Sequence, residues 1–254
     1  MQLTPHGDPP LYFTFPGLAA LGVPHATTSR YCPGIAPFTE PIAADAGRGP
    51  FDPDAVRVLT GAGLGPLRIA YAKQVHGAGV AEAPPSGGFA GHADVLATTT
   101  RALPLAIFTA DCLAVALVDL DAPALVLAHV GWRGTARGAT QVAVAALSAR
   151  GGRPERVRVA IAPSIGPCCY EVDEPVRRAF TAAYGAAAER WFLPTRAGHA
   201  KLDLWAANEA LLAEAGVDPA RIDNARLCTA CHPELLYSYR RGHRGRLATL
   251  AALP

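Results

Sequence analysis

Short apolar runs, separated by polar or glycine-bounded breaks, dominate the middle of the chain. The segment PLAIFTADCLAVALVDL at 104–120 predicts two strands around a break at Thr109–Cys112. ALVLAHVGWRG predicts a further strand from Ala124, and VRVAIAPSIG predicts one from Val157. Runs of about four to eight apolar residues between turn signals are typical of buried strands. We therefore expect this part of the chain to build the core of a sheet.

Weaker strand signals lie on either side of this region. LYFTF is a candidate from Leu11, and LRIAYAKQVHG alternates as a strand that ends at Gly77. ARLCT at 225–229 and LLYSYRR at 235–241 are late strand candidates. Alternation of apolar and polar positions indicates a strand with only one buried face.

Helical spacing, with apolar residues three and four positions apart, marks several segments between the strands. The helix candidates are 52–65, 135–152, 172–185 and 202–217. Two stretches rich in proline or glycine, 41–54 and 82–93, are interpreted as loops. No linker or internal repeat divides the chain, so we predict a single α+β domain over residues 1–254 with a mixed-sheet core. Two packed sheets with helices outside fit the pattern equally well.

Composition narrows the class of protein. Half of the residues are hydrophobic and 17% are charged, which is typical of a folded chain. The formal net charge of +2, without a block of like charges, does not favour a nucleic-acid partner. No run of about 18 apolar residues predicts a membrane span, and the start of the chain does not resemble a signal peptide. We therefore expect a cytoplasmic monomer or small homo-oligomer, without a membrane partner, whose six cysteines are reduced.

The ends of the predicted strands carry residues that can bind a metal. His76, Cys112 and His129 each lie at or just after such an end, where side chains from distant segments can converge on one cleft. Two imidazoles and a thiolate, with a fourth position open, form a donor set for catalytic zinc. Asp111, beside the cysteine in an apolar run, needs a partner or a function. The long spacings do not enforce contact, so a structural role for each residue stays open.

The same residues allow a different chemistry. Cys112 could be a nucleophile with His129 or His76 as its base, and with Asp111 or Gln74 as the orienting group. A cysteine hydrolase of this kind requires a thiol pKa below the ordinary value. The sequence does not decide between the metal site and the nucleophile.

Residues 228–232 read CTACH, which matches the attachment pattern of c-type haem. Such haem is attached after export, and Met1 is the only methionine, so no methionine axial ligand is expected. A structural zinc site would need two further ligands. Cys168 and Cys169 are adjacent, and neighbouring side chains on a strand point to opposite faces. We therefore expect the CTACH residues to be mainly structural.

Other cofactor motifs are missing. The eight histidines include no His-x-His pair, from which multicopper oxidases build their trinuclear sites, so copper is less favoured. No glycine-rich phosphate loop occurs either. GWRG at 131–134 places Arg133 where a strand passes into a helix, which fits an anion site or a plain turn. The arginines within 240–246 fit an anion site or a solvated basic surface.

Five blocks of the sequence together resemble the YfiH-like family, whose members are labelled polyphenol oxidases or laccase-domain proteins and are now described as purine nucleoside phosphorylases. The blocks are KQVHG at 73–77, TADCLAV at 109–115, AHVGWRGTARG at 128–138, IGPCCYEV at 165–172 and CTACHPELLYSYRRG at 228–242. They follow the family's order and cover roughly residues 65–250. The pair of TADC with H-x-GWRG is specific to this family.

The resemblance implies a layered α/β/β/α domain of the α+β class, with Zn²⁺ bound by His76, Cys112 and His129. It implies phosphorolysis of adenosine, inosine and methylthioadenosine, with deamination of adenosine as a second reaction. Purine nucleosides and phosphate are then the expected small-molecule partners. The three metal ligands and Asp111 form the expected catalytic group, with Asp111 as a proton shuttle. The candidates for binding phosphate, whose oxygens match a guanidinium fork, are Arg30, Arg133 and Arg240.

The chain departs from the family pattern in two places. The family usually has an acidic residue after SYRR, where Gly242 and His243 stand here. The early motif TTSRYCPGIAPF at 27–38 lacks the family's glycine pair and the asparagine that follows it. Where these segments shape the nucleoside pocket, we expect substrate preference to change with them.

Overall fold

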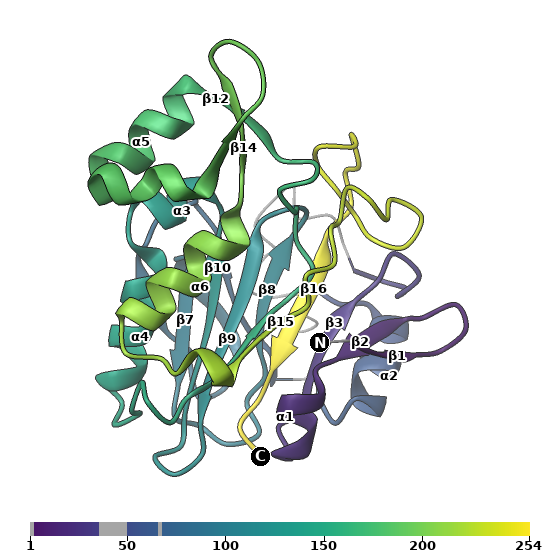
Figure 1. The fold of residues 1–254 in the computed structure, drawn as a ribbon. Coiled ribbons are helices and arrows are strands. Elements are labelled where there is room, and N and C mark those ends of the chain that lie inside the picture. Colours follow the sequence, from purple (N-terminus) through teal and green to yellow (C-terminus); the bar gives the residue numbers. More distant parts are fainter. Residues whose placement is uncertain (1–2, 36–49, 66–67) are drawn as a thin grey trace.

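Two large β-sheets form the centre of the computed structural model, which describes residues 3–35, 50–65 and 68–254 (Figure 1). In order across it, the seven-stranded sheet consists of β1 (Thr4–His6), β2 (Tyr12–Thr14), β3 (His25–Thr28), β16 (Leu247–Ala251), β8 (Leu105–Thr109), β4 (Ala70–Lys73) and β6 (Gly88–His92). The six-stranded sheet consists of β15 (Ile222–Asn224), β11 (Arg158–Ile161), β9 (Leu113–Asp119), β10 (Ala124–Val130), β7 (Val95–Thr98) and β5 (Val80–Glu82).

Both sheets mix parallel and antiparallel pairs. In the seven-stranded sheet, β16 pairs antiparallel with β3 and β8, whereas β4 pairs parallel with β8 and β6. In the six-stranded sheet, β9 pairs antiparallel with β10 and β11, and the outer pairs β11–β15 and β5–β7 are parallel. The predicted α+β class with mixed sheets is confirmed.

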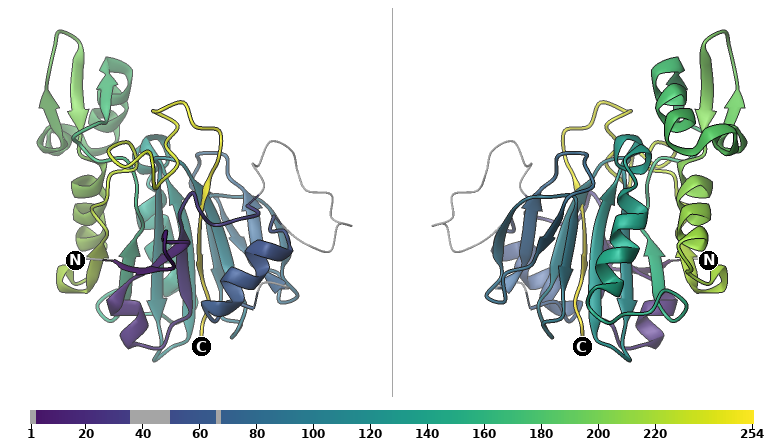
Figure 2. Two further views of the ribbon diagram at one scale, coloured as in Figure 1. Left: turned by 90° about the vertical axis from the view of Figure 1, so that its right-hand side faces the viewer. Right: turned by 90° about the vertical axis from the view of Figure 1, so that its left-hand side faces the viewer.

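The sheets pack face to face, and helices cover their outer faces (Figure 2). Ile107 of β8 and Leu127 of β10 belong to one apolar cluster, which fills the space between the sheets. The neighbouring Phe108 packs instead toward α2 (Pro53–Gly61), and Ala128 packs toward the helices on the opposite side. Successive side chains of a strand point to opposite faces, so these apolar runs bury both faces of each sheet.

The other helices lie mainly outside the six-stranded sheet. They are α3 (Trp132–Ala136), α4 (Ala139–Ser148), α5 (Glu174–Tyr184) and α6 (Leu204–Glu214), with α1 (Pro16–Ala20) near the N-terminus and short 3₁₀ helices at Gly185–Trp191 and Pro219–Arg221. A small sheet of β12 (Glu171–Asp173), β14 (His199–Leu202) and β13 (Phe192–Pro194) stands beside α5. Among the described residues, no helix is both long and apolar enough to cross a bilayer.

The structure corrects two groups of predictions. The expected loop at 82–93 contains the edge strand β6, which the glycine-rich sequence disguises because Gly88 and Gly91 take φ values of 97° and 92° within it. The late strands expected at 225–229 and 235–241 do not form. Turns occupy this segment, apart from an isolated bridge at Cys228, and the last strand is instead β16.

The other elements that the sequence analysis predicted lie close to their expected positions, whereas strands such as β1, β3 and β7 were not predicted. The break expected at Thr109–Cys112 separates β8 from β9, and the four predicted helices correspond to α2, α4, α5 and α6. The strand expected to end at Gly77 ends earlier, at Lys73, so His76 lies in the following turn. Most of the loop expected at 41–54 lies outside the described residues.

Candidate active site

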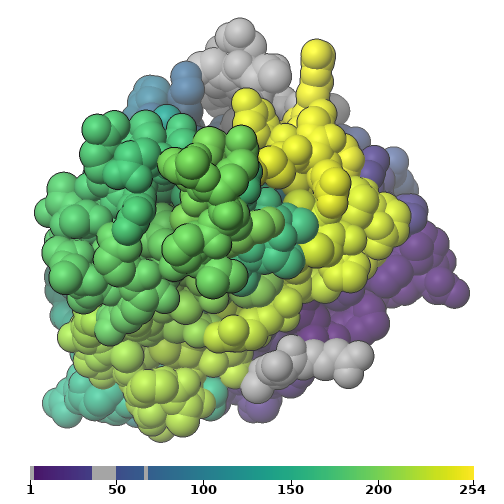
Figure 3. All heavy atoms as spheres, turned by 45° about the horizontal axis from the view of Figure 1, so that its top comes forward, coloured from purple at the N-terminus to yellow at the C-terminus, as the bar shows by residue number. Residues whose placement is uncertain are grey.

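A cavity of about 620 Å³ lies beside the ends of β4, β8 and β10. Aromatic side chains line it from Tyr71, Phe89, Phe108, Trp132, Tyr170 and Tyr239. Basic side chains line it from Lys73, Arg133, Arg240 and Arg246. Figure 3 looks onto this end of the molecule, where the yellow segment that follows residue 225 lies beside the green segment around residue 180. The cavity therefore combines flat apolar surfaces with concentrated positive charge.

His76, Cys112 and His129 meet at this cavity. One donor atom from each lies within 4.8 Å of the others, and the two imidazole rings meet edge to face with centroids 4.8 Å apart. The first follows β4, the second lies in the break between β8 and β9, and the third is the penultimate residue of β10. The sheets thus bring together three residues that are far apart in the sequence.

Asp94, which the sequence analysis did not single out, organises this group. Its side chain is fully buried, and Oδ1 accepts hydrogen bonds from His129 Nδ1 at 2.8 Å and from the backbone N–H of His76 at 2.9 Å. Oδ2 accepts from the backbone N–H of Gly77 at 2.7 Å. Asp94 therefore holds His129 and the turn at His76 with the same carboxylate. A lone carboxylate directly before the apolar strand β7 was the available signal, because a buried charge needs partners.

These contacts set the charge state of the group. Burial raises the pKa of the Cys112 thiol, but the hydrogen bonds and charges of His129 and His76 outweigh it and lower that pKa to about 6. Burial opposes protonation of His129, yet its hydrogen bonds to Asp94 and Cys112 raise its pKa to about 9. With no ion bound, neutral pH therefore favours a thiolate beside an imidazolium. Such a thiolate suits a metal ligand and a nucleophile alike.

The backbone takes uncommon conformations at and beside these residues. His76 and Asp111 take φ values of 56° and 92°, which residues other than glycine rarely adopt. Such conformations persist where surrounding contacts impose them, and they cluster at functional sites. At Gly131, a Cβ atom would lie 2.7 Å from Cys112 Sγ, so the close approach of backbone and thiol requires glycine here.

Asp111 braces the wall of the cavity. Its Oδ1 accepts a hydrogen bond from Thr229 Oγ1 at 2.6 Å, and Oδ2 accepts one from the backbone N–H of Arg240 at 2.7 Å. The segment after β15 is thereby fixed to the break that carries Cys112. Gln74 has a comparable role, because its amide exchanges two hydrogen bonds with the backbone of Phe108 and ties the end of β4 to β8.

The predicted arginines separate into two groups. Arg133 and Arg240 line the cavity, and their guanidinium groups lie over the rings of Trp132 and Tyr170. Arg30 does not line it, because its side chain donates to the backbone carbonyl of Pro233 instead. Arg246, from the arginine cluster at 240–246, also lines the cavity, as does Lys73, which the sequence analysis did not name.

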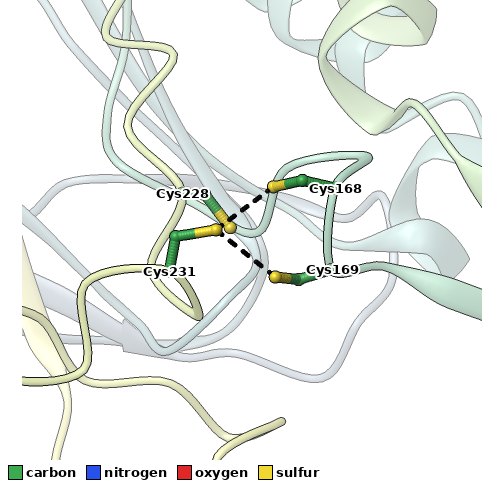
Figure 4. A group of neighbouring side chains, drawn as sticks. All are labelled: Cys168, Cys169, Cys228 and Cys231. Carbon is green, nitrogen blue, oxygen red and sulfur yellow. Dashed lines mark hydrogen bonds between the residues drawn. The ribbon is translucent and has the colours of Figure 1, made fainter.

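The two cysteines of the CTACH segment lie beside two further cysteines, which the sequence analysis did not expect. The sulfurs of Cys168, Cys169, Cys228 and Cys231 all lie within 4.8 Å of one another (Figure 4). Adjacent cysteines on a strand would point to opposite faces, but residues 167–169 form a turn. Adjacent side chains of a helical turn diverge by only about 100°, so both thiols can face the same point.

Comparison with known proteins places the chain in a family. Residues 54–254 match the family described as "Multi-copper polyphenol oxidoreductase laccase". The chain belongs to this laccase-domain family. The resemblance to YfiH-like proteins is thereby confirmed, and so is the fold: the crystal structure of YlmD from Geobacillus stearothermophilus superposes with a TM-score of 0.82 at 28% identity, over 98% of each chain.

Curated relatives of this chain carry two enzyme names. A protein of Deinococcus radiodurans named purine nucleoside phosphorylase is 37% identical over 253 residues, which cover 95% of each chain. A protein of an unknown prokaryotic organism named adenosine deaminase RL5 is 34% identical over 148 residues, which cover 58% of this chain and 56% of that relative. Both names refer to enzymes that act on nucleosides.

Proposed function

We propose that this chain is a zinc-dependent purine nucleoside phosphorylase that acts on adenosine, inosine and methylthioadenosine, with adenosine deamination as a second activity. We further propose that residues 1–254 form one domain of this kind, because the relative from Deinococcus radiodurans aligns over 95% of both chains. The observation that carries the proposal is the convergence of His76, Cys112 and His129 on a cavity lined by aromatic and basic side chains.

The donor set fits zinc. Tetrahedral zinc bonds of about 2.0–2.3 Å to nitrogen and sulfur separate neighbouring ligand atoms by roughly 3.3–3.8 Å. The donor atoms of His76, Cys112 and His129 lie within 4.8 Å of one another, so small side-chain adjustments suffice. Asp94 holds Nδ1 of His129, which leaves Nε2 as the ligand atom. A zinc ion held there would supply Lewis-acid chemistry at the floor of the cavity.

The other cavity residues fit the two proposed substrates, a purine nucleoside and phosphate. A purine is flat and apolar on its faces, and the exposed rings of Phe89 and Tyr239, which line the cavity, offer surfaces on which it can stack. Arg133 and Arg240 supply guanidinium forks that match phosphate oxygens. Phosphorolysis forms a bond from a phosphate oxygen to C1′ of the ribose as the bond from C1′ to the purine nitrogen breaks. The electron pair leaves with the purine, and we assign to Asp111 the transfer of a proton from phosphate to that base.

A product assay tests this proposal. Protein of measured zinc content is incubated with adenosine in the presence and absence of phosphate, and the products are separated. We expect adenine and ribose-1-phosphate only when phosphate is present, together with some inosine. Turnover that is independent of phosphate and yields inosine alone would leave deamination as the sole activity.

A cysteine hydrolase that uses Cys112 with His129 or His76 is the second candidate, because the thiol pKa is lowered to about 6. Its test is the turnover of ester and amide substrates by zinc-free protein. Turnover that iodoacetamide abolishes would support this candidate. A zinc-free protein that is inactive toward esters and amides, but active toward nucleosides once zinc is restored, excludes it.

A further inference from the structure

The four cysteines outside the cavity form a second donor set that the proposed reaction does not use. Cys168 and Cys169 lie in the turn between β11 and β12, and Cys228 and Cys231 lie in the segment between β15 and β16 (Figure 4). We propose that these four thiolates bind one structural zinc ion, distinct from the ion held by the two histidines and Cys112. This site would fasten two loops that are about sixty residues apart in the sequence and that both contribute to the cavity wall.

The sulfur positions fit a single ion. Four thiolates at about 2.3 Å from zinc in a tetrahedron are separated from one another by about 3.8 Å. The sulfur of Cys231 lies 3.4 Å from that of Cys168 and 3.4 Å from that of Cys169, and all four sulfurs lie within 4.8 Å. A disulfide bond requires about 2.05 Å between two sulfurs and would leave the other two thiols without a role. The symmetric approach of two thiols to Cys231 favours a shared ligand centre.

The surroundings of the sulfurs support bound thiolates. The backbone N–H of Gly166 donates to Cys228 Sγ at 3.2 Å, and metal ligands are commonly held by such donors. A zinc ion with four thiolates carries two net negative charges, and basic side chains reach both loops. Lys201 Nζ donates to the backbone carbonyl of Cys168 at 2.6 Å, and Arg241 Nε donates to that of Ala230 at 2.7 Å.

The four thiols lie in the same two loops as residues that line the cavity. Tyr170, which lines the cavity, follows Cys169 directly, and Thr229 between the other two cysteines donates to Asp111. The segment continues to Arg240, another cavity residue. A metal ion that joins the two loops would therefore hold Tyr170 and Arg240 in place without touching the substrate.

The test measures metal content, so its outcome does not depend on activity. Reduced protein is loaded with zinc, freed of excess metal and measured by mass spectrometry for zinc per chain. We expect about two zinc ions per chain in the wild type and about one in both Cys112→Ser and the double variant Cys168→Ser/Cys231→Ser. Both thiols of the double variant are exposed, so their replacement leaves the core intact. Cys32→Ser, at a buried cysteine outside both groups, is the matched control and should retain about two.

Cobalt substitution identifies the ligands independently. A site of four thiolates gives intense sulfur-to-cobalt charge-transfer bands, which should persist in Cys112→Ser and should fall in the double variant to the weaker absorption of the single Cys112 thiolate. The proposal is overturned if reduced wild-type protein binds a single zinc ion that only Cys112→Ser removes, or if the second metal survives the double variant. Iron in place of zinc, or a disulfide bond among these cysteines in protein kept reduced, overturns it as well. None of these results alters the phosphate-dependent product assay, which reports on the proposed reaction alone.

Discussion

Replacing Asp94 by asparagine removes one charge at the centre of the candidate metal site with almost no change in shape. The carboxylate accepts four N–H groups, from His129 Nδ1 and from the backbone of three consecutive residues, Val75, His76 and Gly77. An amide has only one oxygen, so its NH₂ group must face donors. If it faces His129, the ring must accept at Nδ1 and carry its proton on Nε2, where the zinc ion would bind.

These contacts set the expected losses in zinc affinity and in unfolding free energy. A partner of this kind contributes a factor of about 10–100 in metal affinity, which corresponds to about 1.4–2.8 kcal/mol. A hydrogen bond to a charged group contributes about 1.5–3 kcal/mol, and an unpaired buried donor costs about 1–3 kcal/mol. We therefore expect Asp94→Asn to bind zinc about 10–100-fold more weakly and to lose about 1–3 kcal/mol of unfolding free energy in the metal-free state.

Asp119→Asn is the matched control. Asp119 is 2% exposed, and its carboxylate also accepts hydrogen bonds from backbone N–H groups and from Arg156. It ends β9, whereas Cys112 precedes that strand, so the two are roughly 20 Å apart. This variant should lose a similar unfolding free energy and keep its zinc affinity.

The assay is competition for zinc with a chromophoric chelator at fixed pH, combined with urea unfolding of metal-free protein. Measurement of the ¹⁵N resonances of His129 reports which ring nitrogen carries the proton. Wild-type zinc affinity in Asp94→Asn, or an equal loss of affinity in Asp119→Asn, would refute the reasoning.

Three further predictions follow from the same structure. Gly131→Ala should weaken zinc binding at the site of Cys112 by at least about 10-fold, as measured by chelator competition in the Cys168→Ser/Cys231→Ser background, because its Cβ would lie 2.7 Å from Cys112 Sγ; unchanged affinity would contradict this contact. Arg240→Lys should raise the KM for phosphate about 10-fold in steady-state assays, because a lysine cannot donate two parallel hydrogen bonds, whereas an unchanged KM would place phosphate elsewhere. Burial raises the pKa of Asp119, but hydrogen bonds from Arg153 and its neighbours outweigh burial and hold that pKa below its ordinary value of 3.8. Its contribution to stability is therefore present above pH 3.8 and is lost as the pH falls through the lower folded-state pKa, so urea unfolding at pH 7 and pH 3 should show a smaller pH effect in Asp119→Asn than in the wild type.

The sequence predicted the parts of the fold that depend on local pattern. The apolar runs that became β8, β9 and β10 are buried on both faces, so burial and pattern agree. β6 was not recognised, because its glycines lower strand propensity while the pairing with β4 determines the structure. Residues 225–229 and 235–241, after β15, were predicted as strands because the sequence of a turn with several apolar side chains resembles that of a strand.

For the candidate site, residue type and strand ends pointed to His76, Cys112 and His129, and the family resemblance supported the grouping. The role of Asp94 was not predicted, because it depends on the turn at His76 lying beside Asp94 in the folded chain. The four-cysteine cluster was dismissed because the sequence does not reveal whether adjacent cysteines lie in a strand or in a turn. In each case the missing information was the spatial proximity of segments distant in sequence.

The position of β16 has a consequence for fragments of this protein. It lies between β3 and β8, pairs with both, and comes from the far end of the sequence relative to β3. A fragment that stops before Leu247 would lack β16. Among the described residues, this is the only strand that joins the meander of β1, β2 and β3 to the rest of its sheet. Two buried strands, β3 and β8, would then present unpaired N–H and C=O groups, which recruit strands from other chains. Proteolysis between β15 and β16 would therefore be expected to yield aggregates rather than a smaller folded core.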